Sequence, residues 1–336
     1  MIEISGASAH KFISHYHAPD CILASTAVEI EATMSHEVAQ ILLLRIIASQ
    51  GEFIFDHDVN IELNPVRKLL LDYFGGVSNF HEMTVGVMKV LAASEKNISE
   101  GEVYITTFDQ IIYDQKPCQA VGIFKIDGKQ SFIESSLMDD QLTMTLNKGI
   151  GIKDLNKGAL IILDSDPNDM ILKVFQNHSN IKYWCHEFLM IRPLKNEFYQ
   201  TKNTMNLCKD FALKGLHEMA KVDQVDLLNK TLDYFSEKQS FDQSEFEEKV
   251  LASTEIKAAF NSYKDSFEGK HQIEAMSEQF EISKPAFKAA KKYIKSVIKL
   301  DRNFHVYVHG QRQEIERGYD EVRGKNYYKL YFDQES

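Results

Sequence analysis

The feature that most constrains the fold is an alternation of apolar and polar residues between Gly101 and Phe175. It occurs in short runs separated by Asp, Gly, Asn or Pro: EVYITTF, QAVGIFKI, QSFIES, QLTMTLN, GIGIKDL, GALIILD and MILKVF. A period of two is that of a β-strand, whose side chains point alternately to the two faces of a sheet. Short strands bounded by turn residues predict an antiparallel sheet. Asp127-Gly128 predicts a hairpin turn between two of them.

Helical patterns flank this region. A helix is expected from about Ser35 to Ile47, with one stripe buried at Val38, Ile41, Leu42 and Arg45. Asn64-Pro65 opens a second helix, and Asn79 caps a third that runs to about Ser94. Further helices, many with acidic outer faces, are expected at 202–220, 224–236, 243–251 and 255–267.

A chain of 336 residues with 44% hydrophobic residues can bury a sizeable core, and its length suggests two domains. The fold class is therefore predicted as α+β. Residues 1–200 form an α+β domain with an antiparallel sheet, and residues 201–336 form a mostly helical domain that ends in a basic helix and a β-hairpin.

Basic residues are concentrated near the C-terminus. Between Lys284 and Tyr331 there are twelve Lys/Arg and five Asp/Glu, a net charge of +7. The whole chain carries −11, so the remainder carries −11 − 7 = −18. Such asymmetry is typical of a chain whose basic part meets an anionic partner.

The first half of the basic stretch predicts an amphipathic helix. Ser283 is a good N-cap, and Pro285 suits the first turn because its missing N–H is not needed there. Lysines recur at three- and four-residue intervals up to Lys299, while another side repeats Phe287, Ala290, Ile294 and Ile298. The pattern indicates a helix with a cationic stripe.

The second half predicts a hairpin between NFHVYVH and NYYKLYF, joined by the long charged connection 310–325. One face is expected in the core: Phe304, Val306, Val308, Tyr328, Leu330 and Phe332. The other face mixes tyrosine, histidine and lysine, as a surface for base stacking and phosphate contact would. Tyrosine is also common on half-exposed sheet faces, so both interpretations stay open.

A helix-turn-helix motif is a further possibility, with the hairpin as its wing. Ser277 would be the small residue of the first helix, Ile282 and Ser283 the turn, and Phe287 the buried residue of the second helix. Glu281 stands where this motif usually has glycine.

Few residues suggest catalysis or metal binding. His10, His15 and His17 lie close together, but metal ligands need convergent geometry, so surface or capping roles are expected. The segment containing Asp164, Asp166 and Asn168 resembles a calcium loop without its glycine and its bidentate glutamate, and is expected to be an acidic turn. We therefore expect no metal, no cofactor and no enzymatic activity.

Composition also indicates the compartment. Four widely spaced cysteines, Cys21, Cys118, Cys185 and Cys208, predict free thiols in a reducing cytoplasm. Cys185 and His186 are adjacent, which disfavours the contact a catalytic pair needs, so a packing role is expected. No signal peptide is evident at the N-terminus. The longest apolar block, at 41–48, is too short to span a membrane and contains a charge.

Several runs resemble a known family. They are ISEGEVYI, YWCHEFL, YQTKN, KDF, ISKPAFKAAKKYIKSVIKLDRNFHVYVHG, IERGYDE and YYKLYF. Together they resemble the bacterial nucleoid-associated proteins of the NdpA type, in the form common in Bacteroidetes, from about Gly101 to Phe332. The resemblance implies a cytoplasmic protein of the nucleoid that binds DNA without a catalytic step, and a duplex is the expected form of that DNA.

The resemblance does not supply contact residues, so the DNA-binding candidates rest on charge. They are Lys284, Lys288, Lys291, Lys292, Lys295, Lys299, Arg302, Tyr307, Arg312, Arg317, Arg323, Lys325 and Lys329. Contacts to phosphate would give salt-sensitive binding with little sequence preference. A homodimer would offer two basic faces for bridging DNA.

Two other functions are kept open. In the first, the chain is a protein-interaction module of the nucleoid or the replication machinery, whose cationic helix docks on an acidic groove and whose association with DNA is indirect. In the second it is a nuclease, for which the carboxylates between Asp164 and Asp169 are the best metal-binding cluster.

Overall fold

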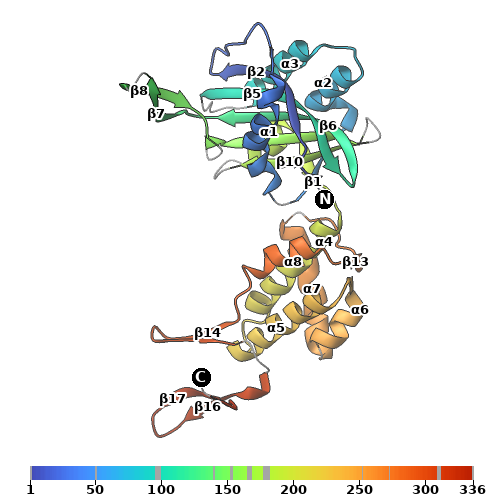
Figure 1. Cartoon of the computed structure of the whole chain (residues 1–336). Helices are drawn as coiled ribbons and strands as arrows, with labels where there is room; N and C mark the ends of the chain where they lie inside the picture. Colours follow the sequence, from blue (N-terminus) through green and yellow to red (C-terminus); the bar gives the residue numbers. More distant parts are fainter. Residues whose placement is uncertain are drawn as a thin grey trace. The chain divides into compact units, whose positions relative to one another are not determined.

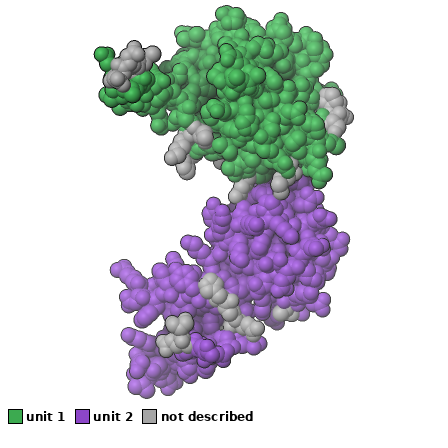
Figure 2. Space-filling view, in the orientation of Figure 1, with its two compact units in different colours: residues 1–194 green, residues 195–336 purple. Residues whose placement is uncertain are grey.

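The computed structural model describes residues 2–49, 51–94, 100–138, 141–151, 154–164, 169–176, 182–251, 253–271, 273–308 and 312–334. The chain is an α+β protein that divides into two compact units, residues 1–194 and 195–336 (Figure 2). Among the described helices, none combines the length and the apolar character needed to cross a membrane.

Unit 1 is built on a nine-stranded sheet whose neighbouring strands are antiparallel (Figure 1). Its order is β11 (Ile191–Pro193), β4 (Phe53–Phe55), β10 (Met170–Gln176), β9 (Lys157–Leu163), β6 (Lys116–Ile126), β5 (Gly101–Tyr113), β2 (Ser8–His17) and β3 (Val28–Glu29). Strand β1 (Ile2–Glu3) also pairs with β5. The predicted antiparallel sheet is therefore present.

Helices cover both faces of this sheet. Helix α1 (Ala32–Ile47) packs on the face that carries Phe108 and Phe124. Helices α2 (Pro65–Phe74) and α3 (Phe80–Ser94), with the π-helical segment η3 (Lys182–Phe188), pack on the opposite face. The central strands are therefore covered on both sides, which explains why β6 is buried without interruption from Ala120 to Ile126.

The helix starts follow the sequence signals. The Asn64 side-chain oxygen accepts a hydrogen bond from the Arg67 N–H at 2.9 Å, and Pro65 occupies the first turn of α2. At α3, Asn79 and Glu82 each accept a hydrogen bond from the other's backbone N–H. Both predicted N-caps are confirmed, and the second is a reciprocal capping box.

The predicted buried stripe of α1 is correct at Leu42, but its centre faces a different side of the helix. Its buried residues are Ser35, Ala39, Leu42, Leu43 and Ile46, whereas Ile41 is 40% exposed. An apolar run as continuous as ILLLRII does not reveal which side faces the sheet, since every choice of face finds apolar residues.

The turn predicted at Asp127-Gly128 does not join a hairpin. Strand β6 ends at Ile126 and pairs with β5 and β9, so both of its edges are occupied. Strands β7 (Gln130–Met138) and β8 (Gln141–Gly149) instead pair with each other in a separate two-stranded sheet. Figure 1 shows this hairpin extending away from the body of unit 1. The run GIGIKDL forms no strand after Gly149 in its described residues.

Surface or capping roles were expected for the three N-terminal histidines, but a surface position is wrong for two of them, because His15 and His17 are buried. His10 is exposed, with Nε2 3.1 Å from an Asp109 carboxylate oxygen. His15 is only 1% exposed, and its Nδ1 accepts a hydrogen bond from the Ala24 N–H at 3.1 Å. Burial, and to a lesser extent the neighbouring His81, lowers the pKa of His15 to about 4.

This buried imidazole makes unit 1 sensitive to acid. The unfolded chain takes up a proton at His15 below about pH 6.5, but the folded chain does so only near pH 4, so stability falls as the pH drops through this window. Between pH 7 and pH 4.5 the loss is about 2–3 kcal/mol. We expect urea unfolding of His15→Asn to depend less on pH than wild type by that amount. The exposed control His186→Asn should keep the wild-type dependence, and equal slopes for wild type and His15→Asn would contradict the assignment.

Unit 2 has a helical body made of α4 (Glu197–Asp210), α5 (Lys221–Glu237), α6 (Gln243–Phe246), α7 (Thr254–His271) and α8 (Lys284–Lys291), with π-helical segments η4 (Phe211–Gly215) and η5 (Glu247–Leu251). Its core is rich in aromatic residues, including Phe211, Phe235, Phe246 and Phe260. Strand β12 (Ser240–Asp242) pairs with β13 (Gln279–Glu281).

The helix-turn-helix prediction was wrong. Helix α7 ends at His271, and Ser277 lies outside any helix. Strand β13 then precedes α8 and pairs with β12, so no tight turn joins two helices here. The local spacing of small and apolar residues could not report this pairing, since its partner lies about forty residues earlier.

The basic helix is also shorter than predicted. Helix α8 ends at Lys291, capped at its start by Ser283, and the chain becomes a strand at β14 (Val297–Leu300). The apolar positions that continued the helical period, Ile294 and Ile298, are buried as expected. However, Ile298 lies in an antiparallel pair with Val306 and not on a helix. Cross-strand pairing therefore overrides the helical period.

The C-terminus forms two hairpins instead of the one predicted. Strand β14 pairs with β15 (Phe304–Tyr307), and β16 (Ile315–Asp320) pairs with β17 (Lys325–Leu330). A small cluster attaches both hairpins to α5: Val222, Val225, Ile298, Val308 and Ile315. Of the face predicted as core, Val308 is buried, but Phe304, Leu330 and Phe332 are largely exposed.

Candidate nucleic-acid interface

An open groove of about 950 Å³ lies between the two C-terminal hairpins and the start of α5. Three predicted DNA-binding residues line it: Lys299 from β14, Arg317 from β16 and Lys325 from β17. Lys221, the first residue of α5, is the fourth basic residue. The two acidic residues of the lining are Glu218 and Asp301, so the basic residues are in excess.

Aromatic side chains complete the lining. Phe304, which is 64% exposed, lies on the β14–β15 hairpin, and Tyr327 and Tyr328 lie on β17. Exposed rings beside cationic side chains can stack on bases or pack on sugars while the cations contact phosphates. Figure 1 shows both hairpins extending from the helical body on the same side.

A tight turn closes each of the two hairpins that border the groove. Asp301 adopts a positive φ of 51° in the turn between β14 and β15, and Gly324 a φ of 62° in the turn between β16 and β17. Tight turns of this kind favour glycine or a short polar residue. Each hairpin thereby directs one face toward the small cluster on α5 and leaves its charged residues exposed.

The structure distributes the candidate residues over several elements. They lie on α8 (Lys284, Lys288, Lys291), at its C-cap (Lys292), before β14 (Lys295), on β14 (Lys299), in the following turn (Arg302), on β15 (Tyr307), in the 3-10 turn η6, Arg312–Glu314 (Arg312), on β16 (Arg317), in the next turn (Arg323) and on β17 (Lys325, Lys329). The side chain of Arg312 lies outside the described part. All the other basic candidates are exposed.

Not all of these residues are equally available to a ligand. Lys329 Nζ lies 3.5 Å from a Glu316 carboxylate oxygen, and Arg323 Nε lies 3.8 Å from Asp320. The Tyr331 hydroxyl donates a hydrogen bond to Glu316 at 2.6 Å. This hydrogen bond, and then the charge of Lys329, lowers the pKa of Glu316. Lys329 and Arg323 therefore each already have an anionic partner within the chain, Glu316 and Asp320 respectively.

The lysines of α8 do not line the groove. Helix α8 packs on α4 and α5 through Ala286 and Ala290, with its lysines exposed. Lys291 Nζ lies 5.7 Å from the centre of the Phe287 ring. The predicted cationic stripe is thus divided, with Lys284, Lys288 and Lys291 on the helix and Lys299 in the groove.

Sequence reasoning missed two groove residues. Lys221 lies far upstream at the start of an ordinary helix, and no local pattern marks it. Phe304 was assigned to the core by alternation, yet its ring lines the groove. The outward face of the first hairpin was identified correctly in part, since Lys299, His305 and Tyr307 share it.

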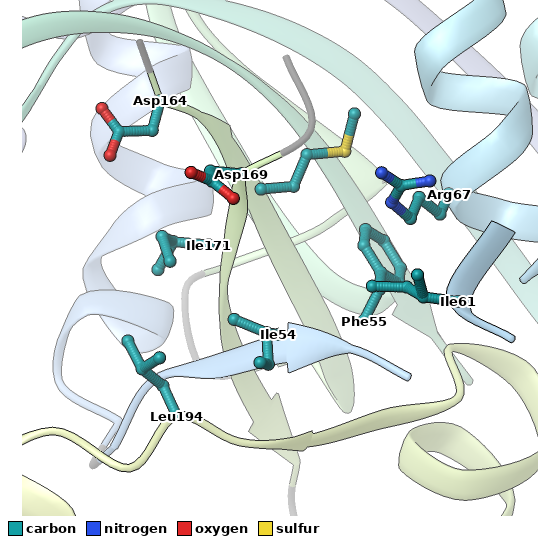
Figure 3. Close-up of a pocket in the computed structure, with 9 residues that line it drawn as sticks. Ile54, Phe55, Ile61, Arg67, Asp164, Asp169, Ile171 and Leu194 are labelled. Carbon is teal, nitrogen blue, oxygen red and sulfur yellow. The ribbon is translucent and has the colours of Figure 1, made fainter. Parts of the chain in front are cut away.

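A second pocket, of about 330 Å³, lies in unit 1 (Figure 3). Asp164 and Asp169 lie on one side of it and Arg67 on the other, around apolar side chains such as Ile54 and Ile171. The remaining members of the calcium-like segment, Asp166 and Asn168, lie outside the described residues. Within the described ranges no three His, Cys, Asp or Glu side chains are placed to hold a metal ion.

Cys185 and His186 both lie in the π-helical segment η3. Cys185 is buried in the core while His186 is exposed, so the two side chains face different surroundings. Burial raises the pKa of the Cys185 thiol to about 11, which disfavours the reactive thiolate. This geometry agrees with the packing role expected for Cys185, and all four cysteines are free thiols.

Comparison with known proteins identifies the family. A family model described as nucleoid-associated protein YejK matches residues 18–329. The chain belongs to this family. The YejK match confirms the resemblance noted in the sequence and makes the chain a nucleoid-associated protein. No curated protein and no solved structure matches the chain.

The YejK family match extends further than the recognised motifs. Those motifs begin at Ile98, whereas the match begins at residue 18 and so includes α1, α2 and α3. The matched range includes strands β3 to β11 and unit 2 up to Lys329, whereas β1 and β2 precede it.

Proposed function

We propose that the chain binds double-stranded DNA through its phosphate backbone, largely without sequence specificity and without a catalytic step. The observation that carries the proposal is the convergence of Lys221, Lys299, Arg317 and Lys325 on one groove beside Phe304 and Tyr327. Cations of this kind neutralise phosphates and release condensed counterions. Membership of the YejK family supports an action at the nucleoid, in the cytoplasm.

The shape of the site supports a duplex as the ligand. The major groove of B-DNA admits a two-stranded β-ribbon, and unit 2 presents two of them. If one ribbon enters the major groove of the DNA, basic residues on both ribbons could contact the phosphates on either side of it. Contacts made to phosphate carry no sequence information, so little sequence preference is expected.

Salt dependence provides the direct test. Four phosphate contacts at about −0.9 each predict a slope of about −3.6 for log K against log salt, and further contacts would make it steeper. We would measure this slope by fluorescence anisotropy, using the full chain and a short duplex of arbitrary sequence from 50 to 300 mM salt. A second duplex of unrelated sequence should give the same affinity. A flat salt response would contradict the proposal.

One observation favours a second function for α8. Its exposed lysines lie outside the groove and repeat along one side of the helix. Such a face could dock on an acidic groove of another nucleoid protein, giving indirect association with DNA. If the wild type fails to bind duplex even at low salt, this protein-interaction function becomes the better explanation.

A further inference from the structure

The hairpin β7–β8 has one apolar face with no covering in the described structure. In the register of the two strands, Ile133 lies opposite Leu146, Ser135 opposite Met144, and Leu137 opposite Leu142. These pairs share one face, because alternate residues of a strand point the same way. Its five large apolar side chains are each 67% to 72% exposed: Ile133, Leu137, Leu142, Met144 and Leu146.

The opposite face carries mostly polar side chains that pair with each other, together with Phe132, which is 50% exposed, near its base. Ser136 and Thr143 hydroxyl oxygens are 2.8 Å apart, and the Asn147 side-chain amide donates to Glu134 at 2.6 Å. The hairpin is therefore amphipathic, like a strand pair that belongs at the surface of a sandwich. An isolated two-stranded hairpin is only marginally stable in water, so an exposed apolar face of this size indicates a missing layer.

We infer that this face is a self-association surface, on which the same hairpin of a second copy packs. The first argument is charge. The three pairs named above contain no charged side chain, and the one charge on this face, Lys148, lies beyond them at the base of the hairpin, opposite Ser131. A charge-free apolar face has no electrostatic preference for a charged partner, but it matches its own copy under two-fold symmetry, where each residue meets an equivalent surface.

The charges around the hairpin exclude the main alternatives. The connection between its strands contains Asp139 and Asp140, and Glu134 lies on the polar face. DNA and anionic membranes both require Lys or Arg at the points of closest approach. The described residues of the hairpin, 130–138 and 141–149, carry one acid, Glu134, and one base, Lys148, so they offer no cationic surface to either.

Geometry gives the second argument. Each strand has nine residues and so extends about 30 Å, far enough for two hairpins to overlap along their length. Face-to-face packing at about 10 Å would turn two isolated hairpins into a small four-stranded sandwich. Figure 1 shows the hairpin clear of the rest of unit 1, so a second copy could approach it. The contact is smaller than a permanent interface, so a reversible dimer with a micromolar Kd is expected.

The test uses the oligomeric state of the full chain, without DNA, so it is independent of the proposed DNA binding. In sedimentation equilibrium the wild type should change from 38.6 kDa toward twice that mass between about 1 and 200 μM, around the expected Kd. The double variant Leu137→Lys/Met144→Lys should weaken the dimer at least tenfold. The matched control Ser136→Lys/Thr145→Lys, which places the same two charges diagonally on the polar face, should dimerise like the wild type.

A cross-linking variant identifies the surface directly. Ser135→Cys places a thiol in the middle of the apolar face, whereas Ser136→Cys places one on the polar face. Mild oxidation should give disulfide-linked dimers of the first and not of the second, with three of the four natural cysteines buried. A wild type that stays monomeric at all concentrations would overturn the inference, as would equal cross-linking of both variants. Binding of a monomeric wild type to phosphatidylcholine vesicles, lost in the double variant, would instead assign the face to lipid.

Discussion

Reversing three charges in the groove, Lys299→Glu, Arg317→Glu and Lys325→Glu, is expected to weaken duplex binding by at least about 100-fold at 150 mM salt, because each lost phosphate contact removes about 0.7 decades of affinity. The three residues come from three strands but line one groove. Repulsion by the new carboxylates adds to the loss. The salt slope should also become shallower by about 3. Fluorescence anisotropy with the same duplex measures both quantities.

The matched control changes the same number of charges on α8. Lys284→Glu, Lys288→Glu and Lys291→Glu alter the net charge equally, but these side chains lie outside the groove. Only the long-range attraction between the chain and DNA should decrease, and at this salt concentration charges more than about 8–10 Å apart are largely screened from each other. If the α8 variant loses as much affinity as the groove variant, the DNA path follows the helix and the groove assignment fails. Circular dichroism should show that both variants keep their secondary structure, since all six residues are exposed.

The second large effect is expected for Asn64→Ala, which should lower the free energy of unfolding of unit 1 by about 3–4 kcal/mol. The Asn64 side chain is fully buried. Its oxygen caps α2, and its amide nitrogen lies 2.9 to 3.0 Å from the carbonyl oxygens of Asp56, Leu189 and Met190. Alanine would remove the cap and leave these carbonyls with one donor fewer. Urea denaturation followed by tryptophan fluorescence would report on unit 1, because the single tryptophan, Trp184, lies in its core.

A second asparagine in the same unit provides the comparison. Asn60 caps the 3-10 turn η1 (Ile61–Leu63), where its side-chain oxygen accepts from the Glu62 N–H at 3.0 Å, but it is exposed. Asn60→Ala should cost no more than about 1 kcal/mol. A similar loss for both variants would show that the buried amide contributes nothing beyond ordinary capping.

The sequence predicted the elements of unit 1 best where the signals were local. The caps at Asn64 and Asn79 are side-chain-to-backbone contacts within one turn of helix, so the two bonded residues are only three positions apart in sequence. The pairing of strands is different in kind. Nothing local around Asp127-Gly128 shows that β9, which begins about thirty residues later, occupies the second edge of β6. The turn signal at Asp127-Gly128 therefore marked the end of β6 but gave the wrong strand partner.

The candidate site was predictable by charge and not by geometry. The basic stretch contains three of the four groove cations, since clustered charge is visible in a sequence. The uninterrupted lysine period suggested one long helix, yet pairing of Ile298 with Val306 places Lys299 on a strand. Lys221 was not predictable, because only tertiary packing of α5 against the hairpins brings it to the groove.

The two C-terminal hairpins divide their side chains into those that fix their position and those that carry charge. Ile298, Val308 and Ile315 hold the hairpins on α5, whereas Lys299, Arg317 and Lys325 are exposed. Exchanges at exposed positions usually change folding stability by no more than about 0.5 kcal/mol. Evolution can therefore raise or lower the charge of the groove one residue at a time while the scaffold remains intact. Within a family of such chains, attraction for polyanions can diverge quickly under a conserved hairpin architecture.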